Sequence, residues 1–301
     1  MNNDNQVLVT GATGGLGRRI VRILCDRDRS VRVFVRLTSR YSELEQRDAQ
    51  IFIGDLLRDK DIHKACRNVR YIISAHGSTE ASGSAQELDY QANIELIDNA
   101  IEMGVEHFVF ISVLGVDRGY EDSPVFKAKR EVEKYLKTSG LNYTILRPSG
   151  FASNLLPPAE RFRDTGIYLL IGDPKIRSSI VSTDDLAKMA VDSLSLEGAK
   201  NQTFAVGGPD ILKREDIPKI FGCIFDREAN PINPPLFLLD GVRQGIGFFR
   251  PGLQKSLGNL RVLLANEFFC TPEEVSRLQS IFSIKLESFE NFIRRYLVTG
   301  D

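Results

Sequence analysis

A glycine-rich turn near the N-terminus constrains the fold of this chain more than any other feature of its sequence. Residues 10–17 read TGATGGLG and directly follow the apolar run Val7-Leu8-Val9. The run is typical of a buried strand, and the apolar positions after the turn recur at helical spacing. The first N–H groups of a helix are unpaired and favour an anion, and glycine lets a phosphate approach the backbone closely. The turn therefore predicts a dinucleotide pyrophosphate site formed by Gly11, Thr13, Gly14, Gly15, Leu16 and Gly17.

Strand-like and helix-like segments alternate through the first half of the chain. Strands are predicted at 6–10, 31–35, 50–53, 69–73, 107–111 and 143–146, and helices at 16–27, 86–103 and 126–138. Alternation at this pace predicts an α/β fold, a doubly wound parallel sheet with helices on both faces. Such a sheet binds its ligand at the carboxyl ends of its strands.

The pattern is less regular after residue 148. It predicts strands at 178–181 and 203–206 and helices at 185–194, 214–224, 236–246 and 287–297. We expect a dinucleotide-binding core at 1–150 and a small mixed C-terminal region at 151–301 on the substrate side. The helix at 185–194 and the strand at 203–206 are expected to pack back on the core.

Composition and charge argue against several classes of function. The 39 Lys and Arg residues and 40 Asp and Glu residues leave a net charge of −1, so no basic field indicates nucleic acid. No apolar run approaches the roughly 18 residues that a membrane span needs. The four cysteines lie far apart in the sequence and form no metal or redox motif. Because only five polar residues stand between Met1 and the apolar run of the first strand, we expect no signal peptide and a cytoplasmic protein.

The end of the second strand distinguishes between the two nicotinamide dinucleotides. Folds that prefer NAD place an acidic residue there to bind the ribose 2′-hydroxyl. This chain has Arg36 at that place and no carboxylate until Glu43. An arginine pairs with a 2′-phosphate through its planar guanidinium. The sequence therefore predicts NADP(H), with Arg18 and Arg40 as weaker auxiliaries.

The turns after the third and fourth strands are predicted to complete the adenosine side of the site. Asp55, followed by Leu56, is placed to hydrogen-bond the adenine amino group, but it is equally suited to cap the next helix. Ala75 and Gly77 lie where the chain must pass the adenine ribose and the pyrophosphate. His76, between them, is assigned no catalytic role.

Several segments together resemble one known family. LVTGATGGLGRRIVRIL, NIELIDNAIEMGVEHFVFISVLG, KAKREVEKYLKTSGLNYTILRPSGFASNLL and STDDLAKMAVDSL are similar to segments of the NmrA-like atypical short-chain dehydrogenases/reductases. The resemblance covers about the first 210 residues well and the remainder loosely. It implies a Rossmann-like core, NADP(H) binding and a small C-terminal region over the substrate side. The family includes reductases, redox sensors and assembly factors.

The resemblance also implies catalytic residues, with one departure. Ser112 occupies the position of the family's serine, and Lys129 that of its lysine. Four residues before Lys129 stands Val125, where typical members have the tyrosine that gives a proton to a carbonyl oxygen. The pattern V-x-x-x-K resembles the isoflavone-reductase-like members, in which the lysine alone is thought to handle the proton.

Two other side chains near this position were considered for the same chemistry. Lys127 lies two residues from Lys129, and such a pair does not share a helix face, so one of the two points at the cofactor. The resemblance selects Lys129. Tyr120, in the loop before the helix, is a weaker substitute for the missing tyrosine, and Tyr143 is expected in the core.

The segment after the sixth strand resembles the family's nicotinamide side. Pro148, Gly150 and Phe151 are expected beside the nicotinamide, and Asn154 at the start of the substrate side. Phe248, Phe249, Phe268 and Phe269 would line an apolar substrate pocket, or belong to the core or an oligomer contact.

Two functions follow, and the sequence leaves both open. The first is an NADPH-dependent reductase of an apolar or aromatic small molecule, with hydride from nicotinamide C4, Lys129 as acid/base and Ser112 orienting the substrate. The second is a non-catalytic NADP(H)-binding redox sensor or assembly protein that acts through a protein partner. The sequence indicates no oligomeric state.

Overall fold

The chain forms two compact units. The computed structural model describes residues 5–78, 83–238 and 251–299. The first unit comprises Met1–Gly119, Pro124–Arg147 and Leu186–Phe204. The second comprises Tyr120–Ser123, Pro148–Asp185 and Ala205–Asp301. Among the described residues, no helix combines the length and the apolar character needed to cross a membrane.

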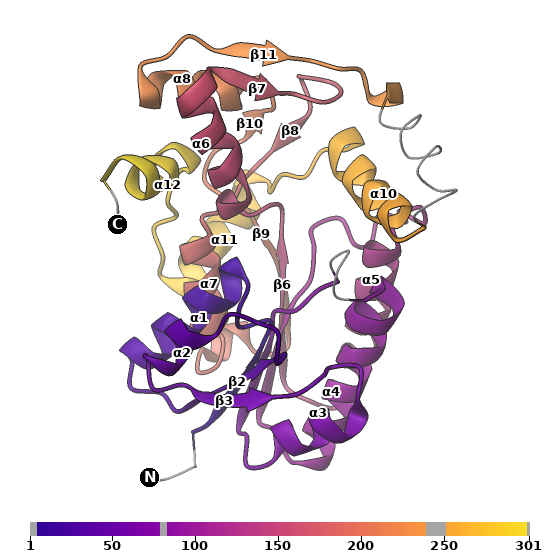
Figure 1. Ribbon diagram of the computed structural model, residues 1–301. Helices are drawn as coiled ribbons and strands as arrows, with labels where there is room; N and C mark the ends of the chain where they lie inside the picture. Colours follow the sequence, from indigo (N-terminus) through magenta and orange to yellow (C-terminus); the bar gives the residue numbers. More distant parts are fainter. Residues whose placement is uncertain (1–4, 79–82, 239–250, 300–301) are drawn as a thin grey trace. The chain divides into compact units, whose positions relative to one another are not determined.

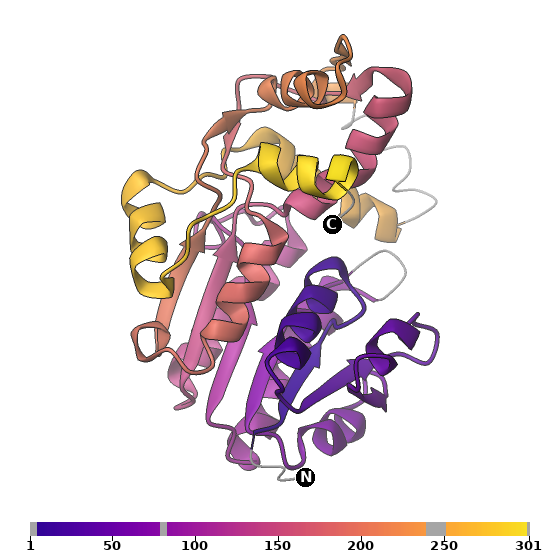
Figure 2. The ribbon, with the colours of Figure 1, turned by 90° about the vertical axis from the view of Figure 1, so that its left-hand side faces the viewer.

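A seven-stranded sheet forms the centre of the first unit, with strand order β3-β2-β1-β4-β5-β6-β9 (Figure 2). The pairs from β3 through β6 are parallel. This sheet confirms the predicted doubly wound α/β fold. Its strands are β1 (Val7–Thr10), β2 (Val31–Val35), β3 (Gln50–Ile53), β4 (Tyr71–Ser74), β5 (His107–Ile111), β6 (Tyr143–Pro148) and β9 (Gln202–Val206).

Helices cover both faces of this sheet. In Figure 1, α1 and α7 lie on one side of the strands, and α3, α4 and α5 on the other. The strands β1, β2, β4 and β5 are buried along their whole length, as a sheet covered on both faces requires. The helices are α1 (Gly15–Asp26), α2 (Ser42–Glu45), α3 (Asp59–Cys66), the π-helix η1 (Ala85–Gln91), α4 (Ala92–Glu102), α5 (Pro124–Thr138), α7 (Thr183–Asp192) and the short 3₁₀-helix η3 (Glu197–Ala199).

The second unit is built around an aromatic core. Phe162, Phe221, Phe289 and Phe292 are at most 1% exposed and belong to one cluster. Its elements are η2 (Ala152–Leu155), α6 (Leu156–Thr165), β7 (Ile167–Leu169), β8 (Arg177–Ser178), β10 (Leu212–Lys213), α8 (Asp216–Phe225), β11 (Asn230–Ile232), α10 (Pro251–Ala265), α11 (Pro272–Phe282), α12 (Phe289–Arg294) and the π-helix η4 (Arg295–Thr299). The strands form two small pairs, β8 with β10 and β7 with β11.

The predicted elements of the first half are confirmed to within a few residues, and those of the second half are less accurate. The strand predicted at 178–181 is wrong beyond Ser178: β8 ends there, and Val181 forms an isolated bridge with Phe151. The helix predicted at 86–103 begins instead as the π-helix η1 and becomes α-helical at Ala92. Most of the helix predicted at 236–246 lies outside the described residues.

Candidate cofactor site

The glycine turn after β1 has a conformation and surroundings that require glycine. Gly11 has φ +69°, and a Cβ there would lie 2.5 Å from the carbonyl oxygen of Ala75. A Cβ on Gly17 would lie 2.1 Å from the carbonyl oxygen of Gly11, so helix and turn touch through backbone alone. Gly14 is the N-cap of α1, and no side chain caps this helix. Its first N–H groups are therefore available to an anion.

A cavity of about 220 Å³ opens beside this turn, at the carboxyl ends of β1 to β4. Gly11, Thr13 and Gly14 line it from the turn, and Arg36 and Ser39 from the chain after β2. Eight other residues that line it are Phe34, Val35, Asp55, Leu56, Ala75, His76, Gly77 and Leu88. The structure thus brings together eight of the residues that the sequence predicts for the cofactor: Gly11, Thr13, Gly14, Arg36, Asp55, Leu56, Ala75 and Gly77. Gly15, Leu16 and Gly17 form the first turn of α1.

Two arginines predicted for the phosphate side have different surroundings. Arg36 is exposed and lines the cavity. Arg18 donates to the carbonyl oxygens of Thr13 and Arg40 at 3.0 and 2.7 Å and pairs with Glu43 at 2.5 Å. Its guanidinium therefore joins the glycine turn to the chain after β2, and Arg36 is the predicted arginine that lines the cavity.

Asp55 is not the cap of the following helix. Helix α3 begins at Asp59, and its N-cap, Arg58, makes no side-chain capping bond. The Asp55 carboxylate accepts instead from the backbone N–H of Leu57 at 3.0 Å, while its own N–H donates to Asp61 at 3.1 Å. These contacts hold the turn after β3 so that Asp55 lines the cavity, and the capping interpretation is wrong.

His76 has a structural role that the sequence did not indicate. It is 8% exposed, and its Nε2 lies 2.9 Å from the carbonyl oxygen of Leu88, which can only accept. Nδ1 is therefore the acceptor, 2.8 Å from the hydroxyl of Thr10. Burial lowers the pKa of His76 to about 4, against the opposing effect of Asp89. The neutral ring thus fastens the end of β1 to η1.

Lys129 lies on the inner face of α5, and Lys127 is exposed, which agrees with their spacing. The ammonium of Lys129 donates to the carbonyl oxygen of Ile111 at 2.8 Å and lies 3.8 Å from a carboxylate oxygen of Asp89. Burial lowers the pKa of Lys129, while Asp89 and Glu133 act in the opposite direction.

Asp89 connects this lysine to the cofactor cavity, and sequence reasoning missed it. Asp89 is 1% exposed, and its other carboxylate oxygen accepts from the N–H and hydroxyl of Ser78 at 3.1 and 2.5 Å. Ser78 directly follows Gly77, which lines the cavity. Asp89 lies on η1, whose first turn is closed by a capping box between Ser84 and Glu87. The spacing S-x-x-E at Ser84 and Glu87 is a sequence signal for the start of this helix, but it does not point to Asp89.

Ser112 is directed into a buried ion-pair network. It is 4% exposed, and its hydroxyl donates to Glu133 at 2.6 Å. Glu133, which is 2% exposed, receives two hydrogen bonds from Arg147, at 2.9 and 2.6 Å. Arg147 also pairs with Asp117 at 2.8 Å. The hydroxyl proton of Ser112 is therefore engaged in the hydrogen bond to Glu133.

The remaining predicted residues belong to the second unit. Pro148 ends β6, Gly150 accepts from the N–H of Val181, and Phe151 is the N-cap of η2. Asn154 lies within η2. Their expected place beside the nicotinamide stays a prediction. Tyr120 contacts the ring of Phe268 with centroids 6.0 Å apart.

Two of the four phenylalanines predicted for a substrate pocket have other surroundings. Phe268 is 3% exposed and belongs to the core, and Phe269 lies under the guanidinium of Arg177. Phe248 and Phe249 lie outside the described residues.

Comparison with known proteins supplies independent evidence for the family of this chain. A family model described as NAD(P)H-binding matches residues 11–197. The photosystem II assembly factor Ycf39 of Guillardia theta is 30% identical over 303 residues, 96% of this chain and 93% of that protein. An NAD(P)H azoreductase of Xenophilus azovorans is 30% identical over 217 residues, 70% of this chain and 71% of its own. The NADPH-dependent quinone oxidoreductase QOR2 of Escherichia coli, solved with NADPH, has a similar fold, with TM-score 0.78, 18% identity, and 96% and 99% of the two chains covered.

Proposed function

Because this chain belongs to the NAD(P)H-binding family, as an NmrA-like atypical short-chain dehydrogenase/reductase, we propose that it is an NADP(H)-binding assembly or regulatory protein that acts through a protein partner. One observation carries the proposal. The hydroxyl of Ser112 donates to buried Glu133, and the ammonium of Lys129 donates to the carbonyl of Ile111. The hydroxyl proton of Ser112 and one of the three ammonium protons of Lys129 are therefore engaged in internal contacts.

The missing tyrosine strengthens this interpretation. Val125 is half-buried on the first turn of α5 and offers no proton to a carbonyl oxygen. Proton transfer by a positioned side chain contributes about 10² to 10⁴ in rate, so its loss favours binding over turnover. The cofactor cavity retains the features that binding requires.

Arg36 supports NADP(H) rather than NAD(H) as the cofactor. Arg36 lines the cavity after β2, where NAD-preferring folds place a carboxylate. A ribose 2′-phosphate would gain a charge-assisted pair with it. Asp55, on the next turn, is the group we assign to the adenine amino group.

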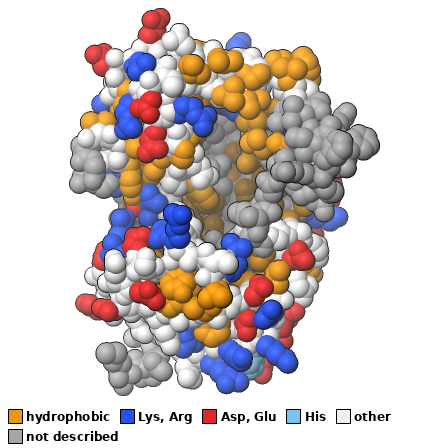
Figure 3. Space-filling model, viewed as in Figure 1, with side chains coloured by type: hydrophobic (Ala, Val, Ile, Leu, Met, Phe, Trp, Pro, Cys, Tyr) orange, Lys and Arg blue, Asp and Glu red, His pale blue; other side chains and the backbone are white. Residues whose placement is uncertain are grey.

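The second unit offers an apolar face that suits a protein partner. Ile167, Leu169 and Ile232 are 44%, 53% and 54% exposed and lie at paired positions of β7 and β11. Hydrophobic side chains gather over these strands at the top of Figure 3. Exposed apolar patches are typical of interaction sites. The full-length similarity to an assembly factor supports the same class of function.

The test separates binding from turnover. The purified protein is given NADPH with deuterium at C4 and a small-molecule extract of the source cell, and mass spectrometry follows the label. We expect tight NADPH binding, no labelled metabolite, and a protein complex that forms with one redox state of the cofactor. A labelled product that disappears in Lys129→Ala would overturn the proposal in favour of a reductase.

A reductase of an apolar or aromatic small molecule is the second candidate. Its specific support is the burial of Lys129, which lowers the pKa of the ammonium and thereby makes proton transfer easier near neutral pH. Hydride would leave nicotinamide C4, Lys129 would supply the proton, and Ser112 would orient the acceptor after leaving Glu133. The azoreductase and quinone oxidoreductase relatives suggest azo compounds and quinones as the first acceptors to assay.

Both candidates use the same cofactor and differ in their partners. The first requires a protein and the second a small molecule, and neither requires nucleic acid. A cytoplasmic location stays a prediction.

A further inference from the structure

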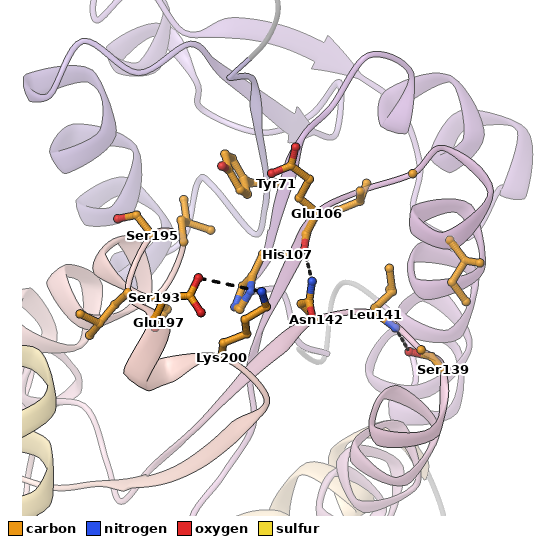
Figure 4. A pocket seen from close by; sticks show the side chains of 16 residues that line it. Tyr71, Glu106, His107, Ser139, Leu141, Asn142, Ser193, Ser195, Glu197 and Lys200 are labelled. Atoms are coloured by element: carbon orange, nitrogen blue, oxygen red, sulfur yellow. Dashed lines mark hydrogen bonds and ion pairs between the residues drawn. The ribbon is translucent and has the colours of Figure 1, made fainter.

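The two ends of strands β4 and β5 differ in how their charged side chains are placed. At the amino ends, the cavity shown in Figure 4 carries Glu106, Glu197 and Lys200. The side chains of these three residues are at least 40% exposed, so water screens their charges. Near the carboxyl ends, Asp89 and Lys129 are only 1% and 8% exposed. Buried charges are costly unless they are paired, so the contacts of this second pair constrain its neighbours most strongly.

The two carboxylate oxygens of Asp89 face different neighbours. Oδ2 accepts from the N–H and the hydroxyl of Ser78, at 3.1 and 2.5 Å. Oδ1 lies 3.8 Å from the ammonium of Lys129. Oδ1 also lies against Gly77, where an added Cβ would come within 3.3 Å of it. The carboxylate of Asp89 therefore contacts both the lysine and the backbone of Gly77, which lines the cofactor cavity.

The backbone around Asp89 is held from two sides. Nε2 of His76 donates to the carbonyl oxygen of Leu88 at 2.9 Å, and the side-chain amide of Asn93 donates to the carbonyl oxygen of Asp89 at 2.9 Å. His76 and Asn93 are both buried. Asp89 itself lies on the π-helix η1, and short π-helical turns are frequent at functional sites. Its carboxylate is thus attached to a backbone that is fixed in place, as a positioning residue requires.

Lys129 reaches the cofactor cavity only indirectly. It is absent from the described residues that line this cavity. Its ammonium lies 5.1 Å from the ring centre of Phe110, on the strand β5, and donates to the carbonyl oxygen of Ile111. Burial lowers the pKa of Lys129, and the carboxylates of Asp89 and Glu133 act in the opposite direction. A ligand in this cavity therefore acts on the lysine by way of Asp89.

We propose that Asp89 is a positioning residue that couples Lys129 to residues 77–78 beside the cofactor cavity, so that the lysine responds when the adenosine part of NADP(H) fills the cavity. Coupling of this kind is carried by contiguous hydrogen bonds and ion pairs. The inference rests on the proposed binding of NADP(H) and adds how the occupied cavity acts on helix α5. A regulatory protein needs such a link between its cofactor and the rest of the chain.

The NMR signal of the lysine side chain tests the coupling. Lysine labelled with ¹³C at Cε is incorporated into the full chain, and the signal of Lys129 is identified by its absence in Lys129→Met. We expect NADPH and the fragment 2′-phospho-ADP-ribose, which lacks the nicotinamide, to shift this signal alike, because both fill the cavity beside Gly77. The signal of Lys134, whose side chain is 65% exposed on the same helix, should not move. A shift with NADPH alone would overturn the proposal, since the lysine would then respond to the nicotinamide directly.

Matched variants test the place of Asp89 in this coupling. In Asp89→Asn, the ligand-induced shift of the Lys129 signal should fall to less than half, and the pKa of Lys129 should fall by about 1–3 units, because the neighbouring opposite charge is lost. Ser78→Ala removes only the hydroxyl bond to Asp89, so it should reduce the ligand-induced shift even if Asp89→Asn does not fold. Glu131→Gln, at a carboxylate that is 41% exposed on the same helix, is the control and should change neither quantity. A merely structural role of Asp89 would leave the pKa of Lys129 unchanged.

The affinity for NADPH, measured on the same samples, keeps the two proposals separate. Failure of NADPH to bind the wild type would overturn the proposed function together with this coupling. Binding of NADPH and the fragment without any change in the Lys129 signal, or a shift of equal size in Asp89→Asn, would overturn the coupling alone.

Discussion

At the scale of single residues, burial decides what each charged side chain does. Arg36 is exposed and lines the cofactor cavity, whereas Arg18 is fixed by Thr13, Arg40 and Glu43. Arg36 could be predicted as a cofactor residue from the sequence, because that prediction needs only its position at the end of the second strand. It could not predict the role of Asp89, because the contact with Lys129 joins η1 to α5 across 40 residues of sequence.

Replacing Arg36 tests the choice of cofactor. We expect Arg36→Ala to weaken NADPH binding about 10- to 100-fold, because a charge-assisted pair with the 2′-phosphate is lost. NADH binding, which involves no 2′-phosphate, should stay unchanged. Fluorescence titration measures both affinities, with Arg67→Ala, an exposed arginine at the C-cap of α3, as the control. A similar loss for NADH would mean that Arg36 supports the fold of the site instead.

Asp89 and Lys129 are expected to act as a pair. Asp89→Asn should destabilise the protein by about 3 kcal/mol, because it leaves the buried ammonium without its counter-charge. The double variant Asp89→Asn/Lys129→Met should recover more than half of that loss in urea unfolding. Glu131→Gln, which removes an exposed pair with Lys134, should cost less than about 0.5 kcal/mol. Additive losses in the double variant would contradict the coupling.

At the scale of helices and strands, local sequence patterns predicted the elements whose position depends on neighbouring residues. The elements of the first half follow from hydrophobic periodicity and from glycines that end helices, and β1, β2, β3 and β5 are predicted to within one residue. Two features depended on more distant contacts. The hydrophobic pattern of η1, the π-helix before α4, does not differ from that of an α-helix. The short strands β7 and β11 are defined by their pairing with each other, which a local pattern does not show.

The first residue of β5 is expected to make stability depend on pH. Burial lowers the pKa of His107 to about 4 in the folded chain, below its ordinary value of 6.5. The unfolded chain then binds more protons between these values, so this contribution is complete above pH 6.5 and is lost as pH falls to 4. His107→Gln should reduce the rise in unfolding free energy between pH 4 and 6.5 by about 3 kcal/mol.

Asp185, in the second unit, is expected to change stability with pH in the opposite direction to His107. Burial raises the pKa of Asp185 to about 6 from its ordinary 3.8, so its contribution falls as pH rises from about 4 to 6. Asp185→Asn should therefore make the overall rise steeper, while His107→Gln makes it shallower. Denaturant unfolding at half-unit pH steps measures both, and identical profiles in the two variants would contradict these assignments.

At the scale of the whole molecule, the chain crosses between its two units several times. The cavity beside the glycine turn belongs entirely to the first unit. Pro148, Gly150 and Phe151, which are predicted for the nicotinamide, belong to the second unit. The prediction for Pro148, Gly150 and Phe151 came from the family resemblance alone. Local sequence patterns could not define the substrate side, because Phe268 and Phe269 are occupied by core and cation–π contacts.

Hydrogen exchange with two ligands tests this division. NADPH is expected to protect the amides of residues 11–17 and also those of 149–153 (the N–H of Pro148 being absent). The fragment 2′-phospho-ADP-ribose, which lacks the nicotinamide, should protect the first segment alone. Equal protection of 149–153 by both ligands, or by neither, would contradict the placement of Gly150 and Phe151 beside the nicotinamide.

The strand order of the large sheet has a consequence for synthesis on the ribosome. Strand β9 is the neighbour of β6, yet 53 residues separate the end of one from the start of the other. Phe204 of β9 is 1% exposed, so the edge of the sheet stays uncovered until about two thirds of the chain has been made. A nascent chain released before that point would expose an unpaired strand edge, the feature that invites aggregation. A pause in translation before β9 has left the ribosome would therefore harm folding more than a pause after β9 has emerged.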